Sequence, residues 1–361
     1  MRHKTGTRRA CAVTCCWAGA MLSLLAACER APEPEPMRSF TGRTMGTTYH
    51  VTITGLSQDD ARARSVQRCV DTVLRSVDEH LSTYSPTSEI TALNRSASTD
   101  WMPVSEPLFA VLAAANRVSV ETGGAFDVTI APFVRLWGFG PGGEKDAAPE
   151  LPPSPEFIHD AAAITGYTWL ELRTSPDRAV RKNRTPLELD VNGIAPGYAV
   201  DRISGCLARA KFADHLVELG GEVRAAGKRA DGAPWRVAIE RPVPGAREAY
   251  TGVALSDLAV STSGSYRDFR RLPNGRTVSH TIDPRIGEPV RHGLASVTVA
   301  HPRAELADAY ATALMVLGPD EGFAVAQRLG LPALFLERIG QSQQLRERVT
   351  PEFEQLRRPA R

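Results

Sequence analysis

The chain has 361 residues, of which 42% are hydrophobic and 23% are charged. This balance is typical of a globular protein with a buried core, and it excludes disorder over most of the length. Lysine and arginine total 43 against 41 acidic residues. Four of the basic residues precede position 28, so the rest of the chain has no positive field to hold nucleic acid phosphates.

The N-terminus is predicted to be an export signal. Residues 1–9 are rich in basic side chains, residues 10–27 are mostly apolar, and small residues stand just before Cys28. The Leu-Ala-Ala-Cys ending resembles the signal of bacterial lipoproteins, in which the cysteine is acylated and becomes the new N-terminus. An ordinary signal peptide that is cut nearby is the alternative. We expect an exported lipoprotein, anchored through Cys28 at the periplasmic face of the inner membrane or at the cell surface.

The rest of the chain is expected to form one domain. A Pro/Glu-rich tether (residues 28–36) should be extended and semi-rigid, the domain spans residues 37–340, and residues 341–361 are expected to be a polar C-terminal tail. No run after the signal approaches the roughly 18 apolar residues of a membrane span. Cys69 and Cys206 could form a disulfide in an oxidising compartment, but their spacing does not favour one, so we expect two buried thiols.

Strand and helix patterns alternate along the domain. A strand is predicted at residues 40–54, and helices at 59–81 and 107–121, the last ending at Gly123 and Gly124. Residues 138–156 are dense in glycine and proline and are interpreted as a surface insertion. Short strands are then predicted at residues 187–191, 216–219, 235–240, 252–255 and 296–300, with helices at 195–210 and 303–317. This order favours a mixed α/β fold rather than a doubly wound sheet.

Common catalytic strings are absent from the sequence. It contains no Gly-x-Ser-x-Gly, Walker A, His-Glu-x-x-His or Gly-x-Gly-x-x-Gly motif. Their absence removes the most frequent hydrolase, nucleotide triphosphatase, metalloprotease and dinucleotide-binding interpretations. The candidate chemistry therefore lies in turns rich in glycine and aspartate.

Two of these turns place an acid beside flexible backbone. In the first, two glycines precede Ala125, Phe126 and Asp127, which suits close approach to a ligand, although a helix end and turn would explain the glycines equally well. In the second, Asp190 is predicted to end a strand just before a helix that starts near Ala195. Free N–H groups at a helix start can hold a phosphate or help to hold a cation, and a simple capping role for Asp190 is the alternative.

Two further motifs carry candidate ligands and bases. Asp308 and Thr312 are four residues apart on a predicted helix, so their oxygens share one face and would suit Mg²⁺ beside a ligand phosphate. Such a pair is more often only a polar face. His280 and Asp283 lie in the segment SHTIDPRIG, which joins a general base to a carboxylate in a rigid turn. A loop histidine with a purely structural role explains that segment as well.

Together these motifs resemble one family. The ordered series MGTTY, STYS, GGAFD, LDVNGIAPGYAVD, LGGEVRAAG, STSGSYR, SHTIDPRIG and ADAYATAL, between residues 40 and 338, is similar to the FAD:protein FMN transferases, the ApbE-type flavin-trafficking lipoproteins. The resemblance implies a T-fold-like α/β (α+β) domain with mixed sheets and flanking helices. It also implies binding of FAD and Mg²⁺, and transfer of FMN from FAD to a threonine hydroxyl of a partner protein with release of AMP. Acceptors in this family are exported or membrane subunits of redox complexes.

The resemblance also assigns roles to residues. Magnesium would be held by Asp308, Thr312 and a backbone oxygen near Gly193. His280 is the candidate for accepting the threonine proton or orienting the phosphate, and Asp283 or Asp308 could do either. The residues expected to border the FAD are Met45, Tyr84, Ala125, Phe126, Asp127, Asp190, Pro196, Ser263, Gly264 and Ile282.

One of these residues departs from the family pattern. Pro196 stands where the family commonly has lysine, although proline suits the first turn of a helix. The departure keeps two alternatives open beside the transferase: an FAD pyrophosphatase that yields FMN and AMP, and a flavin-binding lipoprotein without catalytic activity.

Overall fold

The computed structural model describes residues 35–58, 60–140, 152–243, 245, 247–266, 269–272, 275, 277–340 and 344–357. The predicted signal, nearly all of the tether and residues 141–151 of the predicted insertion lie outside the described residues. The described residues form one compact unit. Among the described residues, no helix has both the length and the apolar character needed to cross a bilayer.

An eight-stranded sheet is the centre of this unit, and every neighbouring pair in it is antiparallel. Strand β15 in the middle is buried over all but its last residue, so both faces of the sheet are covered. The strands, in spatial order, are β1 (Met37–Thr44), β2 (Thr47–Thr54), β6 (His215–Leu219), β7 (Glu222–Ala226), β10 (Ala259–Gly264), β15 (Leu294–His301), β16 (Ala333–Arg338) and β17 (Leu345–Val349).

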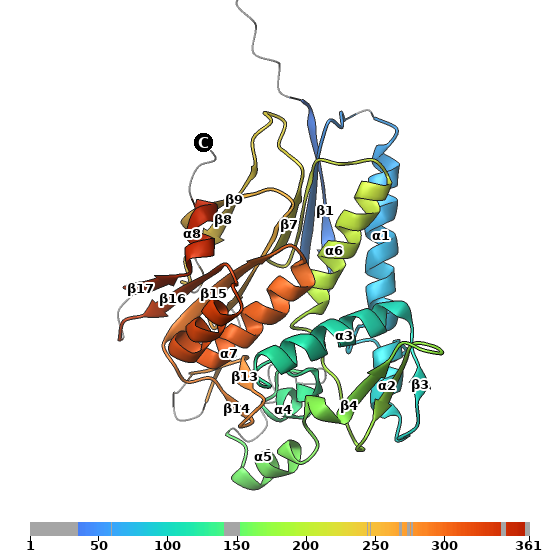
Figure 1. The fold of residues 1–361 in the computed structure, drawn as a ribbon, viewed down its shortest axis with the longest axis vertical. Helices are drawn as coiled ribbons and strands as arrows, with labels where there is room; N and C mark the ends of the chain where they lie inside the picture. The colour runs from blue at the N-terminus through green and yellow to red at the C-terminus, as the bar shows by residue number, and fades with distance from the viewer. Residues whose placement is uncertain are drawn as a thin grey trace, which may run out of the picture. The chain divides into compact units, whose positions relative to one another are not determined.

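Helices pack on one face of the sheet (Figure 1). Helix α6 (Ala195–Arg209) packs on β6 and β7, and α7 (Ala304–Arg328) packs on β10 and β15. Helix α1 (Ala63–His80) runs beside α6, and α3 (Glu106–Glu121) packs against α1 and α7. Helix α7 is bent at Gly318, which has a positive φ and is followed by Pro319.

The other face has its own core, because successive side chains of a strand point to opposite faces. Ala333 and Phe335 belong to the core under the helices, whereas Leu334 and Leu336 belong to the second core. The second core is closed by the hairpin of β8 (Trp235–Glu240) and β9 (Ala249–Leu255) and by α8 (Pro351–Arg357). The last helix is thus part of the folded unit.

Smaller elements complete the described structure. A three-stranded sheet has the order β3 (Met102–Pro103), β5 (Ala179–Lys182) and β4 (Leu170–Arg173). The short helices are α2 (Glu89–Arg95), α4 (Ala131–Leu136) and α5 (Pro155–Ala162), with the 3₁₀ turns η1 (Val128–Ile130) and η2 (Tyr167–Trp169). Two hairpins follow β10: β11 (Phe269–Arg271) with β12 (Thr277–Ser279), and β13 (Ile282–Asp283) with β14 (Glu288–Pro289).

The expected mixed α/β (α+β) class is confirmed, but three local expectations are wrong. Residues 40–54 form a hairpin, not one strand, with a turn at Met45, whose φ is +48°. Residues 187–191 are extended and mostly buried but belong to no strand. The described residues of the predicted tail (344–357 of 341–361) are not a simple tail, because β17 pairs with β16 and α8 packs on the second core.

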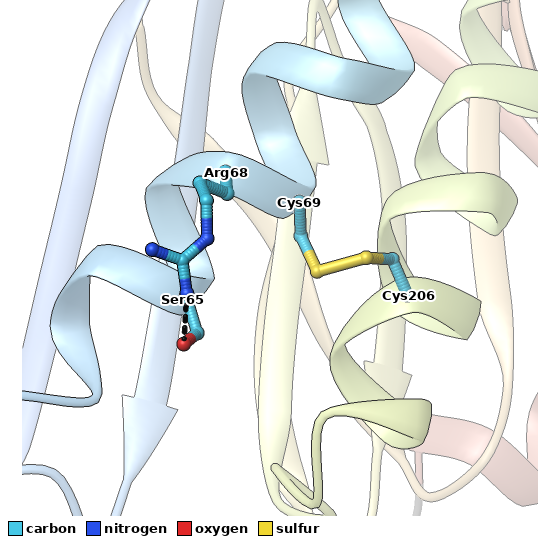
Figure 2. The surroundings of a disulfide bond; sticks show 4 residues. All are labelled: Ser65, Arg68, Cys69 and Cys206. Atoms are coloured by element: carbon cyan, nitrogen blue, oxygen red, sulfur yellow. Dashed lines mark hydrogen bonds between the residues drawn. A yellow bond between two sulfur atoms is a disulfide. The ribbon is translucent and has the colours of Figure 1, made fainter.

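The expectation of two free thiols is also wrong. Cys69 of α1 and Cys206 of α6 form a disulfide, with their Cα atoms 5.7 Å apart (Figure 2). The bond joins residues 137 positions apart in the sequence. Sequence spacing could not show this proximity, because it arises only when the two helices pack side by side.

Candidate functional site

The start of α6 crosses the first turns of α7 at very short range. A side chain at Gly197 would place its Cβ 2.5 Å from the carbonyl oxygen of Ala304, so only glycine permits this approach. The Gly197 N–H donates to Oδ2 of Asp308 at 3.1 Å. The motif of residues 190–201 therefore brings the start of one helix directly onto a carboxylate of the other.

Asp308 is buried at this crossing, with 5% of its surface exposed. Burial raises the pKa of its carboxyl well above the ordinary value, and the nearby negative charge of Glu222 raises it further. Ser261 on β10 donates to Oε1 of Glu222 at 3.3 Å. A buried carboxylate beside a second acid is costly unless a cation joins it.

The neighbouring turn of α7 adds a hydroxyl. Oγ1 of Thr312 lies 3.1 Å from Oγ of Ser263 at the end of β10. A side chain on Gly193 would meet the Phe126 ring at 3.1 Å and Oγ1 of Thr312 at 3.5 Å. The structure thus brings four predicted site residues together, and they come from a loop, a strand, α7 and the turn before α6.

These groups suit a hard cation. Carboxylate, hydroxyl and backbone carbonyl oxygens are the donors that Mg²⁺ prefers, usually with few protein ligands and with substrate phosphates completing the shell. Among the described residues, no group of three or more histidine, cysteine, aspartate or glutamate side chains gathers as a metal cage. The residues present fit a magnesium ion that is shared with a phosphate ligand.

Asp127 and Asp190 are both buried acids, and burial raises the pKa of each carboxyl. Asp127 caps η1 by accepting from the Thr129 N–H, and it also accepts from the Tyr167 N–H at the start of η2. Asp190 accepts from the Asn192 N–H at 2.8 Å, and its own N–H donates to the Val128 carbonyl at 2.7 Å. The two acid-bearing segments are therefore tied to each other through the backbone.

Asp190 opens onto a cavity of about 200 Å³. Thr83, which precedes Tyr84, lies in another part of the wall, and Tyr84 itself is 63% exposed. Oγ1 of Thr83 is buried and has no hydrogen-bond partner among the described residues. The residues that line the cavity are Thr83, Thr91, Asn94, Arg95, Ala131, Val134, Arg135, Gly140, Glu188, Leu189 and Asp190.

The segment with His280 and Asp283 lies on the β12–β14 side. His280 is exposed, and its ring meets the edge of Phe139 at 6.4 Å between centroids, next to the cavity residue Gly140. Asp283 is buried and accepts hydrogen bonds from the backbone and the guanidinium of Arg285. One of the two predicted bases, Asp283, is thus engaged in an ion pair.

The remaining predicted residues are spread around this area. Ile282 is buried in a small core with Phe133 and Trp137. Gly264 follows Ser263 at the end of β10, and half-buried Pro196 lies in the first turn of α6. Met45 packs against the main core and does not line the 200 Å³ cavity.

Sequence reasoning missed several residues of the cavity wall. Asn94, Arg135 and Glu188 line it, yet each is a single polar residue in a segment with no motif. A local signal that could have indicated α2 is Ser88, whose side chain caps the start of that helix. A larger cavity of about 420 Å³, lined by residues such as Arg117, His301 and Tyr310, contains none of the predicted site residues.

Comparisons with known proteins identify relatives of this chain. The chain matches the model of the ApbE family over residues 45–335. It is 36% identical over 338 residues to the FAD:protein FMN transferase of Salmonella typhimurium, covering 91% of this chain and 93% of that protein. It is 35% identical over 322 residues to the FAD:protein FMN transferase of Haemophilus influenzae, covering 88% and 91%.

Solved structures have the same fold. The flavinyl transferase ApbE of Pseudomonas stutzeri, in its apo form, superimposes with a TM-score of 0.79 at 38% identity, covering 90% of this chain and 97% of that one. The flavin transferase ApbE of Vibrio cholerae gives a TM-score of 0.79 at 34% identity, with 90% and 100% covered. Fold, site and relatives define a mixed α/β transferase domain. The chain belongs to the ApbE family.

Proposed function

We propose that this protein transfers FMN from FAD to a threonine hydroxyl of an acceptor protein and releases AMP. The observation that carries the proposal is the meeting of Asp308, Thr312 and Gly193 at the α6–α7 crossing, in a chain whose relatives are named FAD:protein FMN transferases. Those oxygens suit a Mg²⁺ ion on a pyrophosphate, which is the part of FAD that must be cleaved.

The protein would hold magnesium through Asp308, Thr312 and the backbone at Gly193. When bound, Mg²⁺ would neutralise negative charge on the pyrophosphate and on the departing AMP phosphate. Ser263 orients Thr312 through its hydroxyl, and the Gly197 N–H orients the Asp308 carboxylate. These two contacts fix the direction of the oxygens before any ligand arrives.

The flavin and phosphates of FAD would lie between the Tyr84 loop, Asp190 and the segment that includes Phe126. In the transfer step, the threonine oxygen forms a bond to the FMN phosphorus while the bond from that phosphorus to the AMP phosphate oxygen breaks. His280 accepts the threonine proton, and AMP leaves with the bridging oxygen. Asp283 instead holds Arg285 and the shape of the turn.

We also propose that the protein is exported and anchored through Cys28, with subunits of membrane redox complexes as acceptors. The Cys69–Cys206 disulfide supports an oxidising compartment. The resemblance of the Leu-Ala-Ala-Cys ending to lipoprotein signals supports the anchor.

Intact mass spectrometry of an acceptor tests the reaction. The purified protein would be incubated with FAD, Mg²⁺ and an acceptor domain that presents the threonine to be modified. We expect the acceptor to gain the mass of FMN less one water, and EDTA to abolish the gain. Free FMN and AMP without acceptor labelling would indicate a pyrophosphatase instead. Bound FAD that stays intact would indicate a flavin carrier.

A further inference from the structure

The segment of residues 187–191 is mostly buried, but it does not pair with any strand. The side-chain amide of Asn94 takes that place. Its Nδ2 donates to the Leu189 carbonyl at 2.9 Å, and its Oδ1 accepts from the Leu189 N–H at 2.7 Å. An amide side chain offers the same donor and acceptor as a peptide group, so one residue replaces a rung of a sheet directly next to Asp190.

Lys182 fixes the same segment from a second direction. Its side chain is fully buried, and Nζ donates to the carbonyls of Leu93 at 2.8 Å and Leu187 at 3.3 Å. Burial lowers the pKa of Lys182, and the charge of Glu188 opposes that shift. The end of α2 and the start of the 187–191 segment are thus joined by one cation.

The first turn of α2 fixes the loop of Tyr84. Ser88, which caps the helix, is 1% exposed, and its hydroxyl donates to the Ser82 carbonyl at 2.6 Å while its oxygen accepts from the Thr91 N–H at 3.3 Å. A single short helix therefore contacts the loop that carries Tyr84 at one end and the segment that carries Asp190 at the other. Both contacts are made by buried or half-buried polar groups.

The cavity of about 200 Å³ lies against this helix, since Thr91, Asn94 and Arg95 line it together with Thr83 and Asp190. A shift of Leu189 relative to α2 would change the distance between those two walls. We propose that Asn94 is a positioning residue: its two hydrogen bonds to Leu189 set Asp190 relative to the Tyr84 loop, so that the cavity is preformed for the flavin nucleotide. The proposal rests on the proposed function, because FAD is the ligand.

The test compares Asn94→Ala with Asn183→Ala as a matched control. Asn183 is an exposed asparagine whose side chain bonds Glu171, away from the cavity. Asn94→Asp, which keeps an acceptor for the Leu189 N–H and loses the donor, is the second variant in case the alanine variant does not fold. The measurements are hydrogen exchange of residues 187–191 without ligand, FAD binding by fluorescence, and the KM for FAD with the kcat of transfer.

We expect faster exchange at Leu189 in Asn94→Ala, about tenfold weaker FAD binding (1.4 kcal/mol), and a raised KM with kcat within about twofold of wild type at saturating FAD. The control should match wild type throughout. A folded Asn94→Ala with unchanged exchange or unchanged FAD affinity overturns the proposal, as does a loss confined to kcat. Failure of the wild type to transfer FMN while it binds FAD would overturn the proposed function and leave this inference standing. Failure of the wild type to bind FAD would overturn both.

Discussion

The two halves of the candidate site are held by different means. At the α6–α7 crossing, regular helices meet with almost no side chain between them, because Gly197 lies against the backbone of Ala304. Around α2, irregular segments are held by polar side chains, with Asn94 bonded to the backbone of Leu189 and Lys182 bonded to the carbonyls of Leu93 and Leu187. The first half is built by close backbone packing and the second by side-chain hydrogen bonds.

The two halves should therefore be sensitive to different kinds of substitution. Added bulk should damage the crossing, because backbone atoms cannot move aside. Loss of a single polar group should damage the α2 half, because a buried N–H or carbonyl would then lack a partner. The predictions below test that division, from the largest expected effect to the smallest.

Asp308→Asn should have the largest effect. Asparagine keeps the shape of the side chain and still accepts from the Gly197 N–H, but it removes the negative charge that a cation needs. We expect the rate of FMN transfer to fall roughly 1000-fold, or about 4 kcal/mol. Asp320→Asn, on the same helix at a side chain that is 95% exposed, is the control and should be neutral. An Asp308→Asn enzyme with full activity would remove Asp308 from the metal site.

Loss of the disulfide should have the next largest effect. Because Cys69 and Cys206 are 137 residues apart, their bond restricts the unfolded chain strongly, and the double variant Cys69→Ala/Cys206→Ala should lose about 3 kcal/mol of stability. Chemical denaturation of wild type with and without reductant, beside the double variant, measures this loss. If reduced and oxidised wild type unfold at the same denaturant concentration, the bond contributes nothing to the packing of α1 on α6.

The sequence predicted the crossing far better than the α2 half. The start of α6 was predicted at its observed first residue and that of α7 one residue early, because the aspartate-containing motifs in and beside these helices are local signals. The strand predicted at residues 187–191 is absent, because its partner is a side chain and not another strand. The disulfide, the role of Asn94 and the pairing of β17 depend on contacts between distant residues, which no local pattern encodes.

Asp201 is a half-buried polar exception within the regular half, and it should make stability depend on pH. It accepts from Arg224 at 3.0 Å and from the Glu305 N–H at 3.1 Å, yet burial raises its pKa to about 6. The folded protein therefore keeps this proton up to about pH 6, whereas the unfolded chain releases it near pH 4. The free energy of unfolding should fall by up to about 3 kcal/mol as pH rises through that window.

Asp201→Asn is the matched variant for this prediction. It should flatten the change in stability between pH 4 and 6, as measured by urea denaturation at several pH values. A wild type whose stability rises over that range by as much as the variant's would show that Arg224 holds the carboxylate ionised.

Two glycines of α6 test the crossing itself. Gly197→Ala should lose about 2 kcal/mol, because its Cβ would meet backbone atoms of Ala304 that cannot withdraw. Gly205→Ala on the same helix meets only the end of Arg209 at 3.5 Å, so it should gain about 0.5 to 1 kcal/mol from better helix propensity. Thermal or urea unfolding of both variants decides the matter, and equal effects would mean that the crossing is not closely packed in solution.

Pro196→Lys should have the smallest effect. Pro196 lies in the first turn of α6, where a lysine would add a positive charge near the proposed pyrophosphate, worth at most about 1 kcal/mol at a half-buried site. We expect the KM for FAD to fall by no more than about fivefold, with kcat unchanged. Pro196→Ala separates loss of the ring from gain of the charge. Because backbone and Asp308 hold the crossing, a side chain at position 196 can adjust affinity without deciding activity, and a lysine variant that binds FAD more weakly would contradict this view.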